Sequence, residues 1–210
     1  METTETLSVI GYKAFNNDMT CLNNFQYEVN KTYTINDEIE LCKSGFHFCI
    51  IPVDVLTYYD KNNSKFAIIK ATGKIEHDRN KSVCSQITIE KLITLDELYN
   101  LTNGKFVRNN IAIEYYQNGR LHREDGPAIE WKNGDKYWYK NGEFHREDGP
   151  AIENVNGYKA WYKNGERHRE DGPAIECSYG DKEWYKNGER YCIEYAYGKV
   201  WHKNGWYIKN

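Results

Sequence analysis

The chain has 210 residues, a formal net charge of -3 and a mean hydropathy of -0.86, with 40% hydrophobic and 28% charged residues. This length gives room for one large domain or two small ones, and either can bury a core. The slight excess of acid gives no general attraction to phosphate, which argues against broad nucleic-acid or anionic-membrane binding. The 18 Tyr and 6 Trp favour half-exposed β-strands over a thick aliphatic interior.

The opening stretch, METTETLSVIGYKAF, has neither the basic region nor the apolar run of a secretory signal. No segment approaches the roughly 18 apolar residues that span a membrane as a helix. The six cysteines are spread over both halves without a C-x-x-C spacing, which favours reduced and mostly buried thiols. We therefore expect a cytoplasmic protein with no membrane span, no metal and no cofactor.

In chain order, residues 8–103 predict an α+β domain. Strands are expected at SVIGYKAF, FQYEV, KTYTI, EIELC and GFHFCI, and a stronger one at KFAIIKATGKI. A helix is expected to begin at PVDVLTYYD, where Pro52 occupies a first-turn position. In TLDEL, Thr94 and Glu97 have the spacing of a capping box and predict a second helix. One small sheet with two helices accounts for this half.

His47 stands out in this half because it lies between two Phe with cysteines nearby. In a strand His47 and Cys49 share a face, which leaves three interpretations: packed structural residues, a small-ligand pocket or a zinc site. Two irregularly spaced cysteines do not complete the four ligands of a structural zinc site, so packing is favoured. His and Tyr offer donors and stacking surfaces, and the residues expected to line a pocket are Tyr12, Lys13, His47, Tyr58 and Tyr59.

The segments GYKAFNNDMTC, FQYEV, ELCKSGFHFC and PVDVLTYY, followed by a strand ending near TGKI, resemble an uncharacterised domain family common in phage and prophage proteins. This resemblance covers most of residues 9–100 and implies a phage-like origin but no activity. The order of GYKAF and then GFHFC before a helix with Tyr58 and Tyr59 is also similar to ADP-ribosyltransferase folds. In those folds the acid pair comes near the end of the domain, whereas Glu38 and Glu40 precede GFHFC, so no transferase activity is inferred.

The second half is a repeat of 23 residues. The composition changes at LTNGKFVRNN, residues 101–110, which divides the chain into a domain at 1–103 and repeats at 104–210. One glycine recurs at this step, at Gly119, Gly142, Gly165 and Gly188, and the last follows after only 17 residues, at Gly205. A short fixed period indicates a stacked array, and Asn-Gly supplies the positive φ of tight hairpin turns. Each unit is therefore predicted to be a β-hairpin, with the shortened last unit as a cap.

Alternation along the strands assigns faces to the aromatic residues of the array. Trp138, Trp161, Trp184 and Trp201 share one position of the repeat, and a Tyr or His follows each of them. A Trp ladder is therefore expected on one face and a Tyr ladder on the other. Aromatic side chains often anchor interfaces, and the partner-binding candidates are Tyr116, Tyr139, Tyr162, Tyr185 and Trp131.

The stretch HREDGPAIE occurs three times, at residues 122–130, 145–153 and 168–176. A catalytic site needs one constellation, so the repetition favours a structural element. We expect Asp-Gly-Pro to make a return turn in which Asp bonds backbone amides, while His and Arg pair with acids of the next unit. One His per unit also gives too few ligands for a closed zinc site. No catalytic residue is assigned.

The unit GPAIEWKNGDKYWYKNGEFHRED resembles the MORN repeat in its glycine, aromatic-strand and Asn-Gly layout, over about residues 111–210. Arg-Glu-Asp stands where that family often has a second glycine after the basic pair, as in a divergent viral or bacterial variant. The resemblance implies an elongated β-meander that binds proteins or lipids and is not an enzyme.

Together these features favour a non-enzymatic, phage-derived interaction protein that binds a host protein through its repeat array. Inhibition of a host defence complex is a role that the phage-like resemblance implies. One alternative is a nucleotide-binding or ADP-ribosyltransferase-like N-terminal domain, with the repeats as the arm that directs this domain to its target. The other is an array that serves only to form a homodimer.

Overall fold

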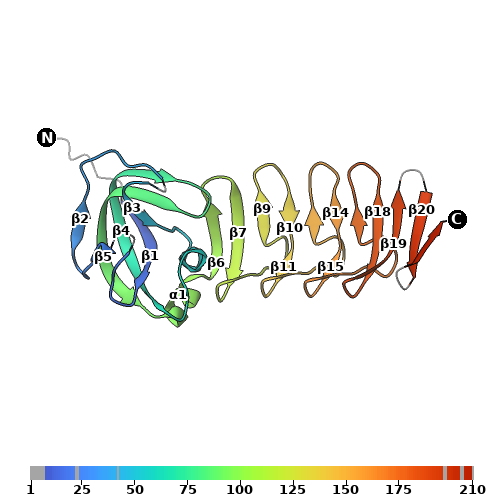
Figure 1. Ribbon diagram of the computed structural model, residues 1–210, viewed down its shortest axis with the longest axis horizontal. Helices are drawn as coiled ribbons and strands as arrows, with labels where there is room; N and C mark the ends of the chain where they lie inside the picture. Colours follow the sequence, from blue (N-terminus) through green and yellow to red (C-terminus); the bar gives the residue numbers. More distant parts are fainter. Residues whose placement is uncertain (1–7, 22–23, 42, 196–197, 204–205, 210) are drawn as a thin grey trace. The chain divides into compact units, whose positions relative to one another are not determined.

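A computed structural model gives the fold of the protein (Figure 1). The structure describes residues 8–21, 24–41, 43–195, 198–203 and 206–209, with side chains up to Tyr195. The chain forms two compact units, Met1–Asn103 and Gly104–Asn210.

The N-terminal unit is built on one antiparallel sheet of five strands, in the order β1-β4-β5-β2, with β3 also paired to β5. The long β4–β5 hairpin forms its centre. The strands are β1 (Val9–Asn16), β2 (Thr32–Thr34), β3 (Phe46–Phe48), β4 (Ser64–His77) and β5 (Ser82–Ile93). The helical segments are the 3-10 helix η2 (Pro52–Thr57) and the α-helix α1 (Leu95–Leu101).

Both faces of this sheet are packed. Successive residues of a strand point to opposite faces, and accordingly Phe15 and Ile69 belong to one buried cluster while Ala14 and Phe66 belong to another. Aromatic side chains of β2, of β3 and of the loop before β2, which holds Tyr27, belong to the first cluster or pack against it. The second is covered by η2 and α1, which contribute Val55 and other apolar residues.

The α+β class predicted for this unit is not confirmed, because the unit is mostly antiparallel strand with little helix. The strand at KFAIIKATGKI and the capping box of Thr94 with Glu97 are confirmed. The helix expected at PVDVLTYYD is only a six-residue 3-10 segment, since Ile51 provides no side-chain cap and β-branched valines alternate in it.

Two strands predicted in this unit are wrong. FQYEV forms one isolated bridge at Gln26 and lies between Asn24 and Asn30, whose positive φ angles turn the chain at both ends. In EIELC, of which Cys42 lies outside the described residues, Glu40 forms one isolated bridge beside a tight turn. Conversely, β5 pairs with three strands, although no strand was predicted there.

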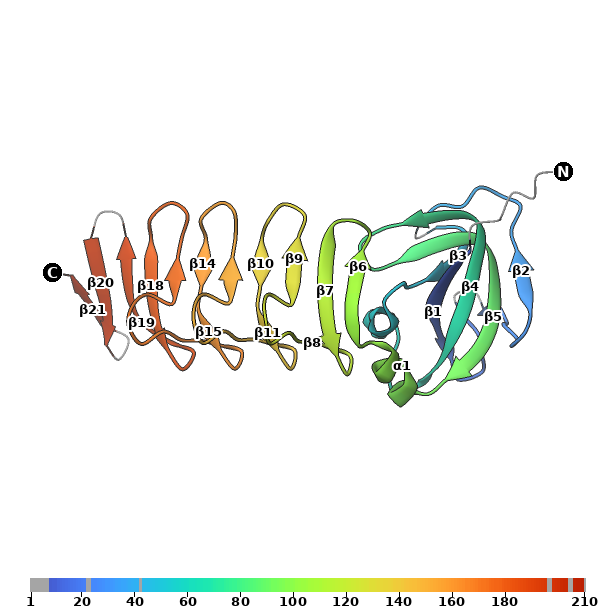
Figure 2. The same cartoon turned by 180° about the vertical axis from the view of Figure 1, so that it is seen from behind.

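The C-terminal unit is a sheet of twelve antiparallel strands, with two small two-stranded sheets, which fits the predicted hairpin array (Figures 1 and 2). The main order is β21-β20-β19-β18-β17-β14-β13-β10-β9-β7-β6. The large sheet contains β6 (Gly104–Arg108), β7 (Ala112–Gln117), β8 (Arg120–Leu121), β9 (Ile129–Trp131), β10 (Lys136–Tyr137), β13 (Ile152–Glu153), β14 (Lys159–Ala160), β17 (Ile175–Glu176), β18 (Lys182–Lys186), β19 (Glu189–Tyr195), β20 (Gly198–Lys203) and β21 (Trp206–Lys209). The small sheets pair β11 (Tyr139–Lys140) with β12 (Glu143–Phe144), and β15 (Tyr162–Lys163) with β16 (Glu166–Arg167).

An interior unit forms two hairpins instead of the single one predicted. The strand expected at KYWYK is interrupted at Trp138, whose N–H donates to the Ala151 carbonyl of the next unit at 2.8 Å. The Trp138 carbonyl accepts from His145 N–H at 3.1 Å. The chain therefore changes pairing partners at this residue and forms β11–β12 as a second hairpin.

Four of the Asn-Gly turns behave as predicted, whereas at Asn133–Gly134 and Asn156–Gly157 only the glycine has positive φ. In the four turns both residues have positive φ, for example 54° at Asn141 and 88° at Gly142. The same holds at Asn118, Asn164 and Asn187 and the glycine after each. This conformation gives the twist of a two-residue hairpin, so the turns set the register of the units.

Candidate interaction surface

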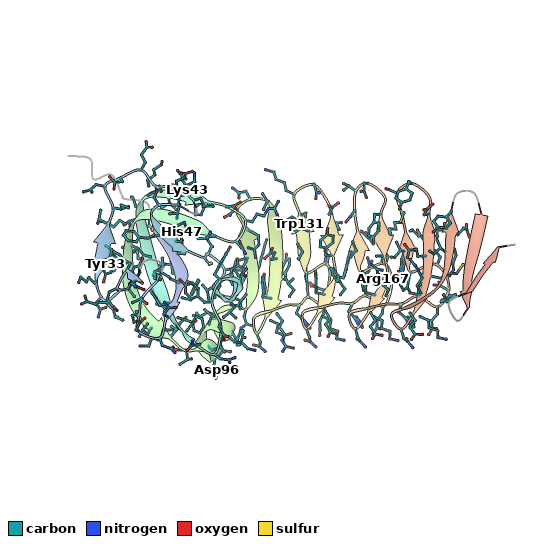
Figure 3. The ribbon with its side chains drawn as sticks, in the orientation of Figure 1. Tyr33, Lys43, His47, Asp96, Trp131 and Arg167 are labelled. Carbon is teal, nitrogen blue, oxygen red and sulfur yellow. The ribbon has the colours of Figure 1, made fainter. Side chains whose placement is uncertain are left out.

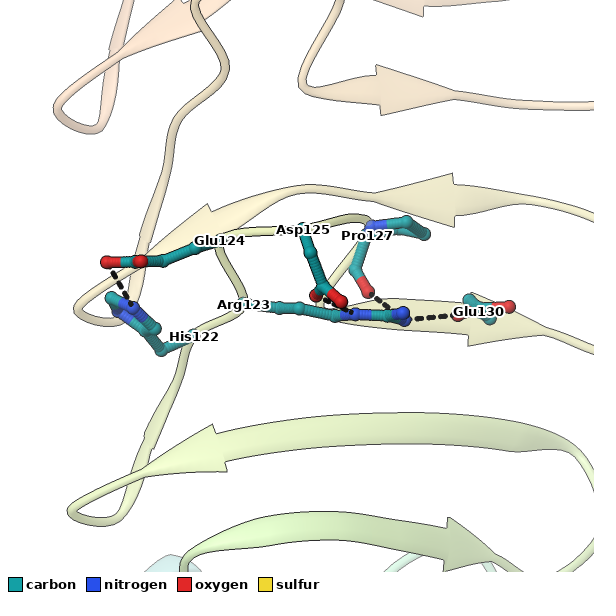
Figure 4. Close-up of polar contacts among 6 residues, drawn as sticks. All are labelled: His122, Arg123, Glu124, Asp125, Pro127 and Glu130. Atoms are coloured by element: carbon teal, nitrogen blue, oxygen red, sulfur yellow. Dashed lines mark hydrogen bonds and ion pairs between the residues drawn. The ribbon is translucent and has the colours of Figure 1, made fainter.

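The repeated HREDGPAIE loops are held by an arginine (Figure 4). Arg123 Nε donates to Asp125 Oδ1 at 2.8 Å, and its Nη1 donates to Glu130 Oε1 at 2.6 Å and to the Pro127 carbonyl at 3.3 Å. The guanidinium carbon lies 4.0 Å from the centre of the Tyr115 ring. Arg146 and Arg169 repeat this arrangement on Trp138 and Trp161.

The expected role of Asp in binding backbone amides is replaced by its bond to the arginine of the same loop. The arginine lies flat on an aromatic ring, which brings its donors within reach of acids in its own unit and not in the next. Pairing also lowers the pKa of Asp125 below its ordinary value, chiefly through the hydrogen bond from Arg123. Asp148 and Asp171 are shifted in the same direction by their own arginines.

The histidine makes the lateral contact between units. His122 Nδ1 accepts from the backbone N–H of Asn141, in the next Asn-Gly turn, at 3.0 Å. The equivalent bonds of His145 to Asn164 and of His168 to Asn187 are 3.1 and 3.2 Å. An acceptor at Nδ1 requires the proton of the neutral ring to be on Nε2. These histidines therefore couple neighbouring units.

One face of the large sheet carries a row of alternating charges, which we call the charged row. Residues directly opposite each other on neighbouring strands alternate between acid and lysine along the array. In sheet order they are Glu130, Lys136, Glu153, Lys159, Glu176 and Lys182. Opposite charges at cross-strand positions stabilise a sheet, and the arginines of the loops add donors to the same glutamates. This face is neutralised within the protein.

A run of aromatic rings, which we call the aromatic patch, begins with Trp131 and Tyr137 on the other face of the large sheet. It continues onto the two small sheets with Tyr139, Phe144 and Tyr162. Ring centroids are 6.2 Å apart for Trp131–Tyr137 and for Tyr137–Phe144. Phe144 then stacks between Tyr139 and Tyr162, at 4.2 and 5.1 Å. All five side chains are half-buried, and burial raises the pKa of Tyr139 to about 12. As expected, Tyr139 lies away from Trp138, which packs with Arg146 toward the charged row.

Polar networks flank the aromatic patch, and their Glu and Tyr occupy equivalent positions of the repeat while their Arg do not. On the N-terminal side, Arg108 forms a two-point pair with Glu114 at 2.6 and 2.8 Å, and Tyr116 Oη donates to the same carboxylate at 2.8 Å. On the C-terminal side, Arg167 Nη1 donates to Tyr185 Oη at 2.9 Å, and this hydroxyl donates to Glu183. Arg167 and Trp131 are labelled in Figure 3.

Of the five partner-binding candidates, Trp131, Tyr139 and Tyr162 thus belong to one patch. Tyr116 belongs to the network on one side of it. Tyr185 is only 6% exposed and is held by Arg167 and Glu183, so it supports the other network. Tyr137 and Phe144 were not among the candidates, although Phe144 differs from the Arg at the same position of the next unit. The side chains of Trp201 and His202 lie outside the described residues.

The pocket candidates of the N-terminal unit divide into an inner and an outer group. Lys13 is buried and its Nζ donates to the His47 carbonyl at 2.8 Å, while Tyr59 Oη donates to Cys21 Sγ at 3.3 Å. Tyr12 pairs with Cys49 through the backbone, and burial raises the pKa of its hydroxyl. Tyr58 is exposed and donates to Asn80 at 2.7 Å.

The His47 ring is half-buried (Figure 3), and its pKa is lowered to about 4, first by burial and then by the charges of Lys13 and Lys81. Among the residues that the structure describes, no three His, Cys, Asp or Glu side chains are arranged to hold a metal ion. No helix in the described ranges has the length and apolar character needed to cross a membrane.

Comparison with known proteins gives a family match for the N-terminal unit. No curated protein matches the sequence. Residues 9–101, which contain the whole described sheet of the N-terminal unit, match a family model described as Domain of unknown function (DUF7666). The match ends before β6, so the repeats lie outside it. The N-terminal unit is therefore consistent with an uncharacterised domain family.

Proposed function

We propose that this chain is a non-enzymatic interaction protein whose aromatic patch binds a protein partner. The observation that carries the proposal is the run of five half-buried rings with a charged, hydrogen-bonded network on each side. Protein interfaces commonly place aromatic anchors at the centre and polar groups at the rim. The patch and its flanks have that arrangement across the large sheet and the two small sheets beside it.

The charged row makes the opposite face a weaker candidate. Each of its glutamates already faces a lysine across the strands and accepts a bond from an arginine. A partner that bound here would meet charges that are already paired within the protein. Because exposed ion pairs contribute little binding energy, exchanging them for pairs with a partner would gain little. The aromatic patch offers apolar area that would be removed from water on binding. Burial of apolar area contributes more to the binding free energy than exposed ion pairs do.

Variation between units favours a folded protein over a periodic polymer as the partner. At the position of Phe144, the other units carry Leu121, Arg167 and Arg190. At the position of Tyr137 they carry Glu114, Ala160 and Glu183. A polymer with a regular repeat would be matched best by identical units, whereas a single aromatic patch suits one protein surface. The phage-like resemblance makes proteins of a host complex, including defence complexes, the first partners to examine.

The test uses the full chain, immobilised and exposed to host lysate, with retained proteins quantified by mass spectrometry. The patch variant is Tyr139→Ala with Tyr162→Ala, and the matched control is Lys136→Ala with Lys159→Ala on the charged row. We expect the patch variant to lose at least about tenfold of a specific partner, and the control to stay within about twofold. Tryptophan fluorescence melts verify that both variants keep the array folded. A partner retained equally by the patch variant, or lost only by the control, would contradict the proposal.

A further inference from the structure

The row of rings in the aromatic patch continues into a guanidinium group, that of Arg167 (Figure 3). Arg167 occupies the position of Phe144 in the next unit of the repeat and faces Tyr162 across the β15–β16 hairpin. Its Nε donates to Tyr162 Oη at 3.3 Å, and its Nη1 donates to Tyr185 Oη at 2.9 Å. The guanidinium carbon lies 5.1 Å from the centre of the Tyr185 ring. The stack of rings therefore ends in a planar cation.

The charge of Arg167 is not paired within the protein. Among the described residues no carboxylate lies within ion-pairing distance of it, and its two hydrogen bonds go to hydroxyl groups. The acid of this network is Glu183, which accepts from Tyr185 Oη at 2.8 Å and from Arg190 Nη1 at 3.1 Å. Two guanidinium groups thus share one carboxylate, which leaves one positive charge.

The network on the N-terminal side of the patch shows the contrast. There one guanidinium, that of Arg108, faces one carboxylate, that of Glu114, at 2.6 and 2.8 Å. A two-point pair of this kind satisfies both charges. The two sides of the patch therefore differ in charge, although both carry a Glu and a Tyr at equivalent positions of the repeat.

Arg167 is oriented before any partner binds. It is half-buried, and the bonds to Tyr162 and Tyr185 fix the plane of its guanidinium, so that little side-chain freedom would be lost on binding. In the part of the chain that the structure describes, its Nη2 makes no hydrogen bond, which leaves two N–H donors for an outside acceptor. A carboxylate that accepts from such a group forms a charge-assisted bond, which is stronger than a neutral one.

We propose that the partner places the carboxylate of an Asp or Glu on Arg167 while a neighbouring apolar side chain of the partner packs on the rings around Phe144. This inference rests on the proposed function and names the chemistry of the protein that the aromatic patch binds. A carboxylate balances the single positive charge, whereas a phosphate carries about two negative charges at neutral pH and would be repelled by Glu183. Because the charges at Arg108 are balanced, the acidic part of the partner lies on the C-terminal side of the patch.

A displayed library of random peptides, selected on the immobilised full chain, tests the proposal. Each enriched peptide is synthesised in two forms, one as selected and one with its Asp or Glu replaced by Asn or Gln. The Kd of each form for the full chain is measured by fluorescence anisotropy. We expect enriched peptides to carry an acid beside an apolar residue, and the amide form to bind at least about tenfold more weakly than the acid form.

Variants identify the group that reads the acid. Arg167→Gln removes the cation, so the acid and amide forms should bind this variant within about twofold of each other. Lys163→Gln is the matched control, because it removes a positive charge from the same hairpin at a residue that points to the opposite face from Tyr162. In this control the tenfold difference should persist. Tryptophan fluorescence melts show whether Arg167→Gln keeps the array folded, and the two peptide forms on wild type decide even where it does not.

The outcomes separate this inference from the proposed function. Peptides enriched without Asp or Glu, or an amide form that binds wild type as tightly as the acid form, would overturn the acidic partner and leave the patch as a binding surface. Tyr139→Ala removes one ring of the patch and keeps both hydroxyls that hold Arg167. Undiminished binding of the selected peptides by Tyr139→Ala, or a library from which wild type enriches nothing, would contradict the proposed function as well.

Discussion

Arg146 gives the sharpest test of how the repeat array is held together. Its replacement by Met keeps the apolar stem and removes the guanidinium. The stack on Trp138, at 3.9 Å, is worth about 1 kcal/mol at a partly buried site. The bond to the Pro150 carbonyl and the pair with Glu153 each add about 0.5 to 1 kcal/mol, after discounting for solvent. Asp148 is 84% exposed and is left out of this sum. We expect Arg146→Met to lower the free energy of unfolding by about 2 to 3 kcal/mol.

The assay uses a feature of the sequence, because all six Trp lie in residues 104–210. Tryptophan fluorescence during urea unfolding of the full chain therefore reports the array, while the N-terminal unit contributes no tryptophan signal. Arg146→Lys keeps the charge but not the planar donors, so it should recover less than half of the loss. A loss below about 0.5 kcal/mol, or full recovery by Lys, would refute the network as the source of stability.

Three further outcomes follow from other contacts. His145→Ala removes the bond to Asn164 and should cost about 1 kcal/mol, with equal effects at the two equivalent histidines and no change in melting temperature on adding a chelator; a melt sensitive to the chelator would contradict this. In Gly11→Ala the new Cβ would overlap the Phe48 ring, so hydrogen exchange in residues 9–101 should rise while tryptophan fluorescence is unchanged. The pKa of His47 is about 4 in the folded protein against an ordinary 6.5, so the unfolded chain binds a proton first as the pH falls. The free energy of unfolding of the N-terminal unit should therefore fall as the pH is lowered from about 6.5 to 4. Measured by hydrogen exchange, this fall should be steeper in wild type than in His47→Gln.

The features that the sequence predicted well depend on neighbours along the chain. The turn at Asn141 requires positive φ at two successive residues, and Asn-Gly supplies it whatever the rest of the fold does. The capping box of Thr94 and Glu97 closes within four residues. Each of these is decided by local geometry.

The features that were missed depend on partners far away in the sequence or in another unit. The break at Trp138 is set by a carbonyl of the next unit, and the pattern KYWYK carries no sign of it. FQYEV has the alternation of a strand, but its aromatic side chains pack onto the core of the sheet, where Tyr27 is buried. The aromatic patch was only partly predicted because Phe144 joins two tyrosines from different units, a contact that repeat spacing alone does not reveal.

HREDGPAIE occurs three times because its residues make the contacts that hold each interior unit in place. Its Arg, Asp and Glu hold the loop to an aromatic ring and to the charged row, and its His bonds the next Asn-Gly turn. Every interior unit faces the same neighbours through these groups, so the same residues solve the same problem each time. The positions of Tyr137 and Phe144 are not used for that contact, and they differ from unit to unit. The repeated residues hold the array together, and the positions that vary between units are the ones that the proposed binding of a single partner would use.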